Sequence, residues 1–179
     1  MSENRLRAAV IGCGAIAKTH AKVLADADYA ETVALVDIDA ERATALRDAT
    51  APEAAVYTDW RKMLAEVKPD VVHICTPHDL HCDMACECLN RNINVYLEKP
   101  ICISEEELER VEAAAAASSA KITVSFQNRR IATTRLFYHL IEQEGGPVAG
   151  RGLVTWRRGY DYYTADDWHG RREIGRAHV

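Results

Sequence analysis

The stretch LRAAVIGCGAIA, residues 6–17, decides the fold of this chain. Its first half, Leu6–Ile11, is apolar and ends at a glycine, which is typical of a buried strand. The residues that follow, Ala15–Ala25, carry apolar side chains at helical spacing. A buried strand that passes through glycines into a helix predicts the first half of a βαβ unit, with a phosphate-binding turn between the two elements.

The glycines of this turn stand in the pattern Gly-x-Gly-x-x-Ala. Gly12 permits the tight turn, Gly14 lets a pyrophosphate approach the backbone, and Ala17 allows the helix to pack closely on the strand. The phosphates would meet the free N–H groups at the N-terminus of the helix. A tight strand–helix turn without a ligand is the alternative interpretation. The predicted cofactor contacts of the turn are Gly12, Cys13, Gly14, Ala15, Ile16 and Ala17.

An acidic residue stands where a dinucleotide-binding unit has its ribose contact. Asp37 follows the apolar run Val33–Val36 and lies twenty residues after Ala17. A carboxylate there accepts hydrogen bonds from the ribose hydroxyls and repels a 2′-phosphate, so NAD is predicted over NADP. Ile38, the next residue, is a further predicted cofactor contact, and Arg42 is the only nearby cation that would soften the preference. The alternative is that Asp37 merely caps the next helix.

Short apolar runs alternate with helical segments as far as about residue 126. Strands are predicted at residues 6–11, 33–36, 55–57, 71–75, 93–97 and 122–126, and helices at 15–25, 40–47, 79–89 and 104–119, with one more capped by Thr58 or Asp59. Strands that alternate with helices of this length predict a parallel sheet covered by helices on both faces. The expected fold class is therefore α/β, a doubly wound parallel sheet of the Rossmann type.

The pattern changes after Gln127. Residues 130–144 are predicted to form a helix, Gly145–Pro147 a turn, and Gly152–Tyr160 a strand with exposed aromatic side chains. A different structural unit is expected to start here.

Composition limits the class of protein and its partners. A chain of 179 residues accommodates one complete α/β domain and a short remainder. The net charge is −5 without a basic block, so neither nucleic acid nor an anionic membrane is an expected partner. The N-terminus lacks the apolar region of a secretory signal, and no stretch approaches the roughly 20 apolar residues of a membrane span. A cytoplasmic location is expected.

Six cysteines are expected to be free thiols in a reducing compartment. Cys82 and Cys86 have the spacing of metal ligands, but no second such pair follows. On a helix these two residues share a face, whereas Cys88 points elsewhere. No metal site is predicted.

A second group of polar residues follows the fourth predicted strand. Thr76 and Pro77 are expected to form the wall beside a nicotinamide ribose, because ligands of open α/β sheets bind beyond the carboxyl ends of the strands. His78 and His81 are further predicted cofactor contacts. A polar loop and helix start is the alternative interpretation for each histidine.

Glu98-Lys99-Pro100 follows the fifth predicted strand, at the sheet edge that carries the glycine turn. The Lys99 ammonium would polarise a carbonyl, or exchange a proton with a carbinol oxygen if burial lowers its pKa. Pro100 keeps Lys99 out of helical geometry and allows a cis bond. The alternative is a surface lysine that ends a strand.

In this order, these motifs resemble the Gfo/Idh/MocA oxidoreductases, named for glucose–fructose oxidoreductase, inositol dehydrogenase and a rhizopine-catabolism protein. The resemblance spans about residues 6–172, although position 78 is more often asparagine in that family. The motifs that carry it are the glycine turn, Asp37, Cys75-Thr76-Pro77-His78-x-x-His81, Glu98-Lys99-Pro100 and Gln127-Asn128-Arg129-Arg130.

The resemblance implies an NAD(P)-binding Rossmann domain at residues 1–127 and the beginning of an α+β substrate domain at residues 128–172. Lys99 would match the catalytic lysine, and Glu98 and Gln127 would lie at the cofactor. Arg129 and Trp168 would contact substrate together with Lys99. Family members often pair through the sheet of the second domain, so a homo-oligomer is expected.

The chain departs from the family near its end. The glycine-rich turn that follows Asp167–Arg171 in relatives is missing. Ile174–Val179 matches one reading frame of a widely used sequencing adapter, so residues 173–179 are interpreted as a non-native read-through tail. His178 is accordingly not predicted to be catalytic. A genuine short form of the protein is the alternative interpretation.

The leading hypothesis is hydride transfer between NAD(P) and a sugar, cyclitol or related polyol or carbonyl compound, with Lys99 handling the proton or charge of the oxygen. The fragment itself is expected to bind the cofactor and to be inactive. A non-catalytic NAD-binding module or sensor is the alternative. An S-adenosylmethionine-dependent methyltransferase shares the glycine turn but gives no reason for Lys99.

Overall fold

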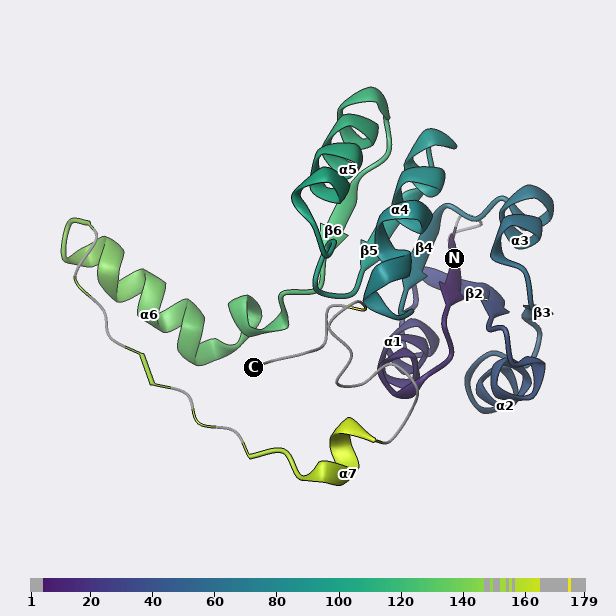
Figure 1. The fold of residues 1–179 in the computed structure, drawn as a ribbon, viewed down its shortest axis with the longest axis horizontal. Helices are drawn as coiled ribbons and strands as arrows, with labels where there is room; N and C mark the ends of the chain where they lie inside the picture. The colour runs from purple at the N-terminus through teal and green to yellow at the C-terminus, as the bar shows by residue number, and fades with distance from the viewer. Residues whose placement is uncertain are drawn as a thin grey trace. The chain divides into compact units, whose positions relative to one another are not determined.

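The computed structural model describes residues 5–146, 149, 152–153, 155, 157–164 and 174. It divides into two compact units, residues 1–124 and residues 125–179 (Figure 1). The first unit contains all the strands of the described residues, and each unit is treated by itself below. The predicted boundary after residue 127 stays a prediction.

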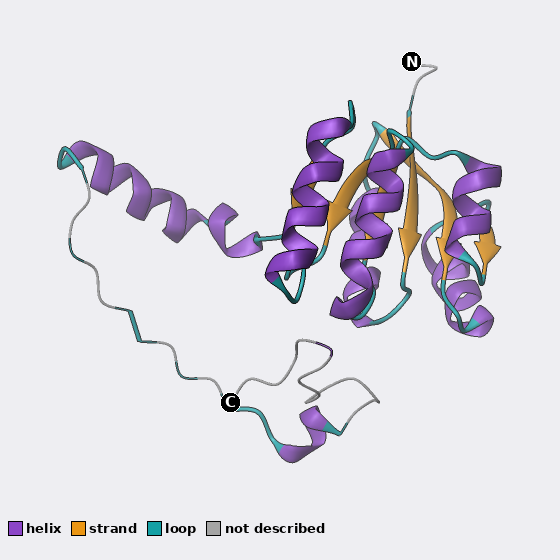
Figure 2. Ribbon diagram, turned by 45° about the horizontal axis from the view of Figure 1, so that its top comes forward, coloured by secondary structure: helices purple, strands orange, loops and turns teal. Residues whose placement is uncertain are grey.

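The first unit is built on one parallel sheet of six strands in the order β3-β2-β1-β4-β5-β6 (Figure 2). The strands are β1 (Leu6–Ile11), β2 (Ala30–Val36), β3 (Ala55–Tyr57), β4 (Val71–Ile74), β5 (Asn94–Leu97) and β6 (Ile122–Val124). The order reverses between β1 and β4, and this is the position at which ligands bind to sheets of this kind. The predicted Rossmann-type α/β fold is confirmed.

The strand register aligns the carboxyl ends at one edge of the sheet. Ile11 of β1 pairs with Val36 of β2 and with Ile74 of β4. Ile74 in turn pairs with Leu97 of β5. The loops that leave these four strands therefore start next to one another, although they are far apart in the sequence.

Helices cover both faces of the sheet, as the parallel pairing requires (Figure 2). They are α1 (Ala15–Ala25), α2 (Ala40–Thr50), α3 (Trp60–Val67), α4 (His81–Asn90) and α5 (Glu105–Ala117). On one face, α1 and α2 pack small side chains such as Ala17 and Ala43 against β1 and β2. On the other, α3, α4 and α5 enclose a larger core that includes Met63, Leu89 and Val95.

The predicted boundaries differ from the observed ones where hydrogen bonds decide them. The predicted helix at 79–89 is wrong at its start: a 3₁₀ turn η1 (His78–Leu80) comes first, and α4 begins only at His81. The reason is a short-range bond in which the Leu80 N–H donates to the Pro77 carbonyl at 3.2 Å. Compared with the prediction, β2 begins three residues earlier and α2 ends three residues later.

The second unit contains a 3₁₀ turn η2 (Gln127–Arg130), α6 (Ala132–Gln143) and the short α7 (Tyr160–Tyr163). The predicted strand at Gly152–Tyr160 is wrong for the residues that the structure describes, because none of them is a strand and Tyr160 begins α7. A strand persists only with a hydrogen-bonded neighbour, and the described part of this unit offers none. The predicted substrate contact Trp168 lies outside the described residues, as does the proposed tail apart from Ile174.

Across the described residues, no helix is both long enough and apolar enough to cross a membrane.

Candidate functional site

Gly12 is required by the packing of the protein itself. Its φ angle is +85°, a conformation that side chains other than glycine rarely adopt. A Cβ atom at this position would lie 2.7 Å from the carbonyl oxygen of Cys75, the residue directly after β4. The glycine therefore lets the loops after β1 and β4 approach each other closely.

Gly14 faces open space instead. A Cβ atom there would meet nothing within 4 Å, and the φ angle of −74° is ordinary, so packing in the protein does not demand a glycine. Gly14 is the N-cap of α1, and α1 has neither a side-chain cap nor an acidic residue in its first turn. By contrast, the N-termini of α2, α3 and α5 are capped by Asp39, Asp59 and Ser104.

The amino end of α1 is thus uncapped by side chains and open at Gly14. The uncapped N–H groups of its first turn and the positive end of its dipole favour a negatively charged group. The missing side chain of Gly14 lets that group approach the backbone. These features fit a pyrophosphate, which is the use predicted for the glycine turn.

Asp37 follows β2 and holds the glycine turn. Its Oδ2 accepts the Cys13 N–H at 2.8 Å, and its Oδ1 accepts the Asp39 N–H at 3.0 Å. The residue that caps α2 is Asp39, which accepts the N–H groups of Glu41 and Arg42. The alternative that Asp37 only caps a helix is therefore wrong.

The surroundings of Asp37 carry more negative than positive charge. The Arg42 guanidinium lies 3.5 Å from Asp37 and 3.6 Å from Asp39, so two carboxylates share one cation. An added 2′-phosphate would meet this excess of negative charge. Ile38 is 93% exposed beside Asp37 and offers apolar surface to a bound group.

His81 joins the loops that follow β4 and β5. Its side chain is fully enclosed, with Nδ1 2.7 Å from the Pro100 carbonyl and Nε2 3.1 Å from the Thr76 carbonyl. The enclosed ring therefore connects these two backbone segments and has no exposed surface of its own. Thr76 and Pro77 are half-buried, and His78 is buried with its ring centroid 5.6 Å from that of His81.

Glu98 and Lys99 come directly after β5, at the same edge of the sheet. Lys99 is half-buried, and its backbone N–H donates to Oε2 of the buried Glu98 at 3.3 Å. The Lys99–Pro100 peptide bond is cis, the isomer that the sequence allowed. The side chain of Lys99 therefore starts from a loop whose backbone is held by its neighbour's carboxylate.

Sequence reasoning missed a buried polar cluster behind this loop. The Nε2 atom of His20, on α1, lies 3.0 Å from Oε1 of Glu98, and its Nδ1 atom lies 3.0 Å from Nδ1 of His73 on β4. The His73 ring stacks on Tyr96 of β5 with centroids 5.0 Å apart. One signal was available: His20 shares the buried face of α1 with Ala17 and Leu24.

The half-buried His73 and the buried His81 make the stability of the first unit depend on pH. Burial, together with the nearby His20, lowers the pKa of His73 from 6.5 to about 4, and burial also lowers the pKa of His81. Between pH 6.5 and about 4, His73 binds more protons in the unfolded chain than in the folded chain. The free energy of unfolding therefore falls as the pH falls from 6.5. His73 alone accounts for roughly 3 kcal/mol of this loss by pH ~4, since a tenfold change in proton affinity is worth about 1.4 kcal/mol.

Urea unfolding at several pH values from about 7 down to about 4.5 tests this expectation. The variant His73→Asn removes the titrating group, so its stability should decline less steeply with acid than that of the unchanged chain. The variant His139→Asn alters an exposed histidine and serves as the control. A His73→Asn profile as steep as that of the control contradicts the assignment.

The structure brings most of the predicted site residues to one edge of the first unit. The glycine turn, Asp37, Thr76 and Lys99 all follow strands whose ends are in register. Gln127 and Arg129 belong to η2 of the second unit, where the Arg129 guanidinium lies over the Phe126 ring.

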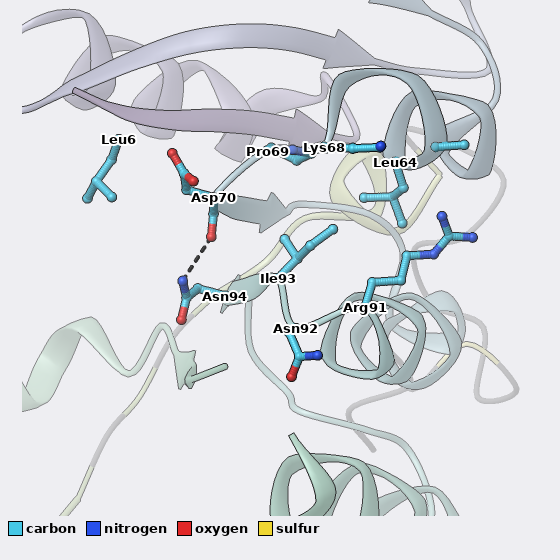
Figure 3. A pocket seen from close by; sticks show the side chains of 10 residues that line it. Leu6, Leu64, Lys68, Pro69, Asp70, Arg91, Asn92, Ile93 and Asn94 are labelled. Carbon is cyan, nitrogen blue, oxygen red and sulfur yellow. Dashed lines mark hydrogen bonds between the residues drawn. The ribbon is translucent and has the colours of Figure 1, made fainter. Parts of the chain in front are cut away.

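A shallow hollow of about 630 Å³ lies at the opposite edge of the sheet (Figure 3). It is formed by the starts of three strands, near Leu6, Asp70 and Asn94, and the Asn94 side-chain N–H donates to the Asp70 carbonyl at 2.9 Å. Ligands of open α/β sheets bind at the carboxyl ends, so this hollow is not the dinucleotide site.

Three buried cysteines of the first unit have the properties of structural thiols. Burial raises the pKa of Cys13, Cys82 and Cys88 to about 12, so these thiols stay protonated at neutral pH. The residues that the structure describes contain no group of three or more His, Cys, Asp or Glu side chains placed to hold a metal ion.

Comparison with known proteins connects this geometry to a family. The model of an oxidoreductase family with an NAD-binding Rossmann fold matches residues 6–126. The inositol 2-dehydrogenase of Salmonella typhimurium is 33% identical over 126 residues, which are 69% of this chain and 38% of the relative. The D-glucoside 3-dehydrogenase of Escherichia coli is 31% identical over 159 residues, which are 88% of this chain and 44% of the relative.

Among solved structures, the WlbA dehydrogenase of Bordetella pertussis in complex with NADH and UDP-GlcNAcA superimposes with a TM-score of 0.86 at 32% identity. The match covers 96% of this chain and 53% of that protein. The chain thus spans about half the length, or less, of the relatives that it matches.

Proposed function

The chain belongs to the Gfo/Idh/MocA oxidoreductase family, and on that premise we propose that this protein transfers a hydride between NAD and a carbinol or carbonyl carbon of a sugar, cyclitol or related polyol. The observation that carries the proposal is the open amino end of α1 at Gly14, on the sheet edge that also presents Asp37 and Lys99. Relatives named as inositol and D-glucoside dehydrogenases support this substrate class.

The residues of the first unit divide the binding of NAD between them. The N–H groups of the first turn of α1 bind the pyrophosphate, and the Asp37 carboxylate accepts hydrogen bonds from the adenosine ribose. Ile38 contacts the adenosine half through its exposed side chain. Thr76 and Pro77 form the wall at the nicotinamide ribose. Gln127 belongs to the second unit, and its proposed contact with the cofactor rests on the family resemblance alone.

Lys99 is the proposed catalytic residue. NAD, when bound, supplies the hydride-accepting carbon of its nicotinamide ring. The Lys99 ammonium stabilises charge on the substrate oxygen, or its neutral amine accepts the proton of a carbinol oxygen. His81 and Glu98 keep the loop that carries Lys99 in place through their bonds to Pro100 and to the Lys99 backbone. Arg129 and Trp168 are proposed substrate contacts.

Calorimetry with NADH, combined with a turnover assay on myo-inositol and alkyl D-glucosides, tests this function. The chain covers 38–44% of the curated relatives, so we expect it to bind NADH and to turn over little or nothing. Absence of NADH binding contradicts the proposal. A non-catalytic NAD-binding module is the second candidate, because the chain covers less than half of the length of these relatives. Binding of NADH without turnover favours this candidate if the same result is obtained with a form extended to the length of the relatives.

Asp37 is expected to set the cofactor preference. The unchanged chain should bind NADH at least tenfold more tightly than NADPH, because a 2′-phosphate would meet the carboxylates of Asp37 and Asp39. In Asp37→Asn the side-chain oxygen still accepts the Cys13 N–H while one negative charge is lost. Titrations of both cofactors with both proteins should show the ratio falling severalfold. An unchanged ratio contradicts the role of the carboxylate.

Self-association and a cytoplasmic location remain proposals that rest on the family. Light scattering of the purified protein tests the first, and microscopy of a tagged copy in its own cell tests the second.

A further inference from the structure

The buried cluster of His20, His73 and Glu98 links three elements that meet at the proposed site. His20 lies on α1, the helix whose amino end is the anion site, while Glu98 precedes Lys99. We propose that His20 is a positioning residue: it holds the Glu98 carboxylate and, through it, the backbone of Lys99 in fixed relation to the cofactor-binding helix. This inference rests on the proposed function, which assigns α1 to NAD and Lys99 to the substrate.

The two oxygens of Glu98 have different partners. Oε1 lies 3.0 Å from Nε2 of His20, and Oε2 accepts the Lys99 N–H at 3.3 Å. An ionised carboxylate only accepts hydrogen bonds, so the Nε2–H of His20 donates to it. A carboxylate held at both oxygens cannot rotate without breaking one of these bonds. The Lys99 backbone is therefore restrained by a side chain on a different element.

His73 fixes the orientation of the His20 ring. Their Nδ1 atoms are 3.0 Å apart, so one proton lies between them and one of the two atoms accepts it. The His73 ring is held in turn by stacking on Tyr96, and the His20 ring meets Tyr96 edge-on with centroids 5.5 Å apart. These contacts thus connect Tyr96 on β5 to His73 on β4 and His73 to His20 on α1. The bond from His20 to Glu98 then leads back to the end of β5.

Stability alone does not account for this cluster. Buried polar and ionic groups can often be replaced by apolar side chains of similar size without loss of stability, because desolvation offsets their attraction. The neighbouring residues on the same face of α1, Ala17 and Ala21, pack without any polar group. The specific effect of this cluster is that it fixes Glu98 in one orientation, and that orientation sets the geometry of the loop after β5.

Nuclear magnetic resonance of the chain tests the inference through the exchange rate of the Lys99 amide proton. In His20→Leu, which removes both hydrogen bonds, this proton should exchange at least tenfold faster. The Cys13 amide, held by Asp37 in the same molecule, should keep its rate within twofold. His20→Gln retains an N–H donor toward Glu98 and should restore most of the protection. Lys22→Leu alters an exposed position of the same helix and serves as the control.

NADH titrations of the same variants complete the test. We expect the dissociation constant to rise at least fivefold in His20→Leu and to stay within twofold in His20→Gln and Lys22→Leu. If His20→Leu does not fold, His20→Met replaces it, since methionine likewise offers no N–H to Glu98, and it should loosen the Lys99 amide in the same way. Unchanged exchange at Lys99 in a folded variant overturns the inference. Failure of the unchanged chain to bind NADH overturns the proposed function instead, because the amide measurement does not depend on the cofactor.

Discussion

Replacing Gly14 by aspartate should weaken NADH binding at least 100-fold without weakening the fold. Gly14 is the N-cap of α1, and aspartate is among the best N-cap residues, so the helix should gain a few tenths of a kcal/mol. The new carboxylate would occupy the N–H groups that the pyrophosphate needs and would repel its charge. Calorimetric titration gives the affinity, and thermal unfolding gives the stability.

Gly14→Ala is the matched control for the charge. Its Cβ would meet nothing within 4 Å, so the protein tolerates it and only the approach of the ligand is obstructed. We expect a loss of affinity of about tenfold, intermediate between the unchanged chain and Gly14→Asp. Retention of full NADH affinity by Gly14→Asp would show that the amino end of α1 is not the phosphate site.

Replacing Gly12 by alanine should destabilise the first unit by roughly 3 kcal/mol or more. The φ angle of +85° is unfavourable for alanine, and the added Cβ would overlap with the Cys75 carbonyl at 2.7 Å. The Gly12 N–H donates to the Val36 carbonyl and the Cys75 N–H donates to the Ile11 carbonyl, so neither backbone segment moves aside easily. Urea unfolding measures the loss.

Substitutions at the two glycines of the turn should therefore change different properties of the protein. The same substitution, glycine to alanine, should lower stability at position 12 and affinity at position 14. A loss of less than about 1 kcal/mol in Gly12→Ala would mean that the loops after β1 and β4 separate at little cost. That outcome would contradict the close packing on which the site geometry depends.

Periodicity and turn chemistry allowed much of the first unit to be predicted. The bounds of β1, α1 and β3 match the structure, since each is marked locally by an apolar run and a glycine or a helix signal. The edge of the sheet at which Lys99 lies followed from parallel pairing alone. The sequence did not show that a 3₁₀ turn precedes α4. That turn, η1, depends on the hydrogen bond from the Leu80 N–H to the Pro77 carbonyl.

The buried cluster could not be predicted, because it depends on contacts between elements. His20 and Glu98 are separated by 78 residues and meet only when α1 packs on the sheet beside β4 and β5. In the residues that the structure describes, the predicted strand at Gly152–Tyr160 failed for a related reason. Its aromatic residues favour a strand locally, but whether a strand forms depends on a partner elsewhere in the chain.

The bond from the Cys13 N–H to Asp37 has a consequence for how the cofactor preference changes over generations. The carboxylate that discriminates against the 2′-phosphate also anchors the turn, so a mutation that widens cofactor use weakens the scaffold at the same time. A lineage that drifts toward NADP must keep an acceptor at position 37 or first acquire stability elsewhere. Laboratory evolution toward NADPH should accordingly enrich asparagine or serine at this position and leave alanine rare.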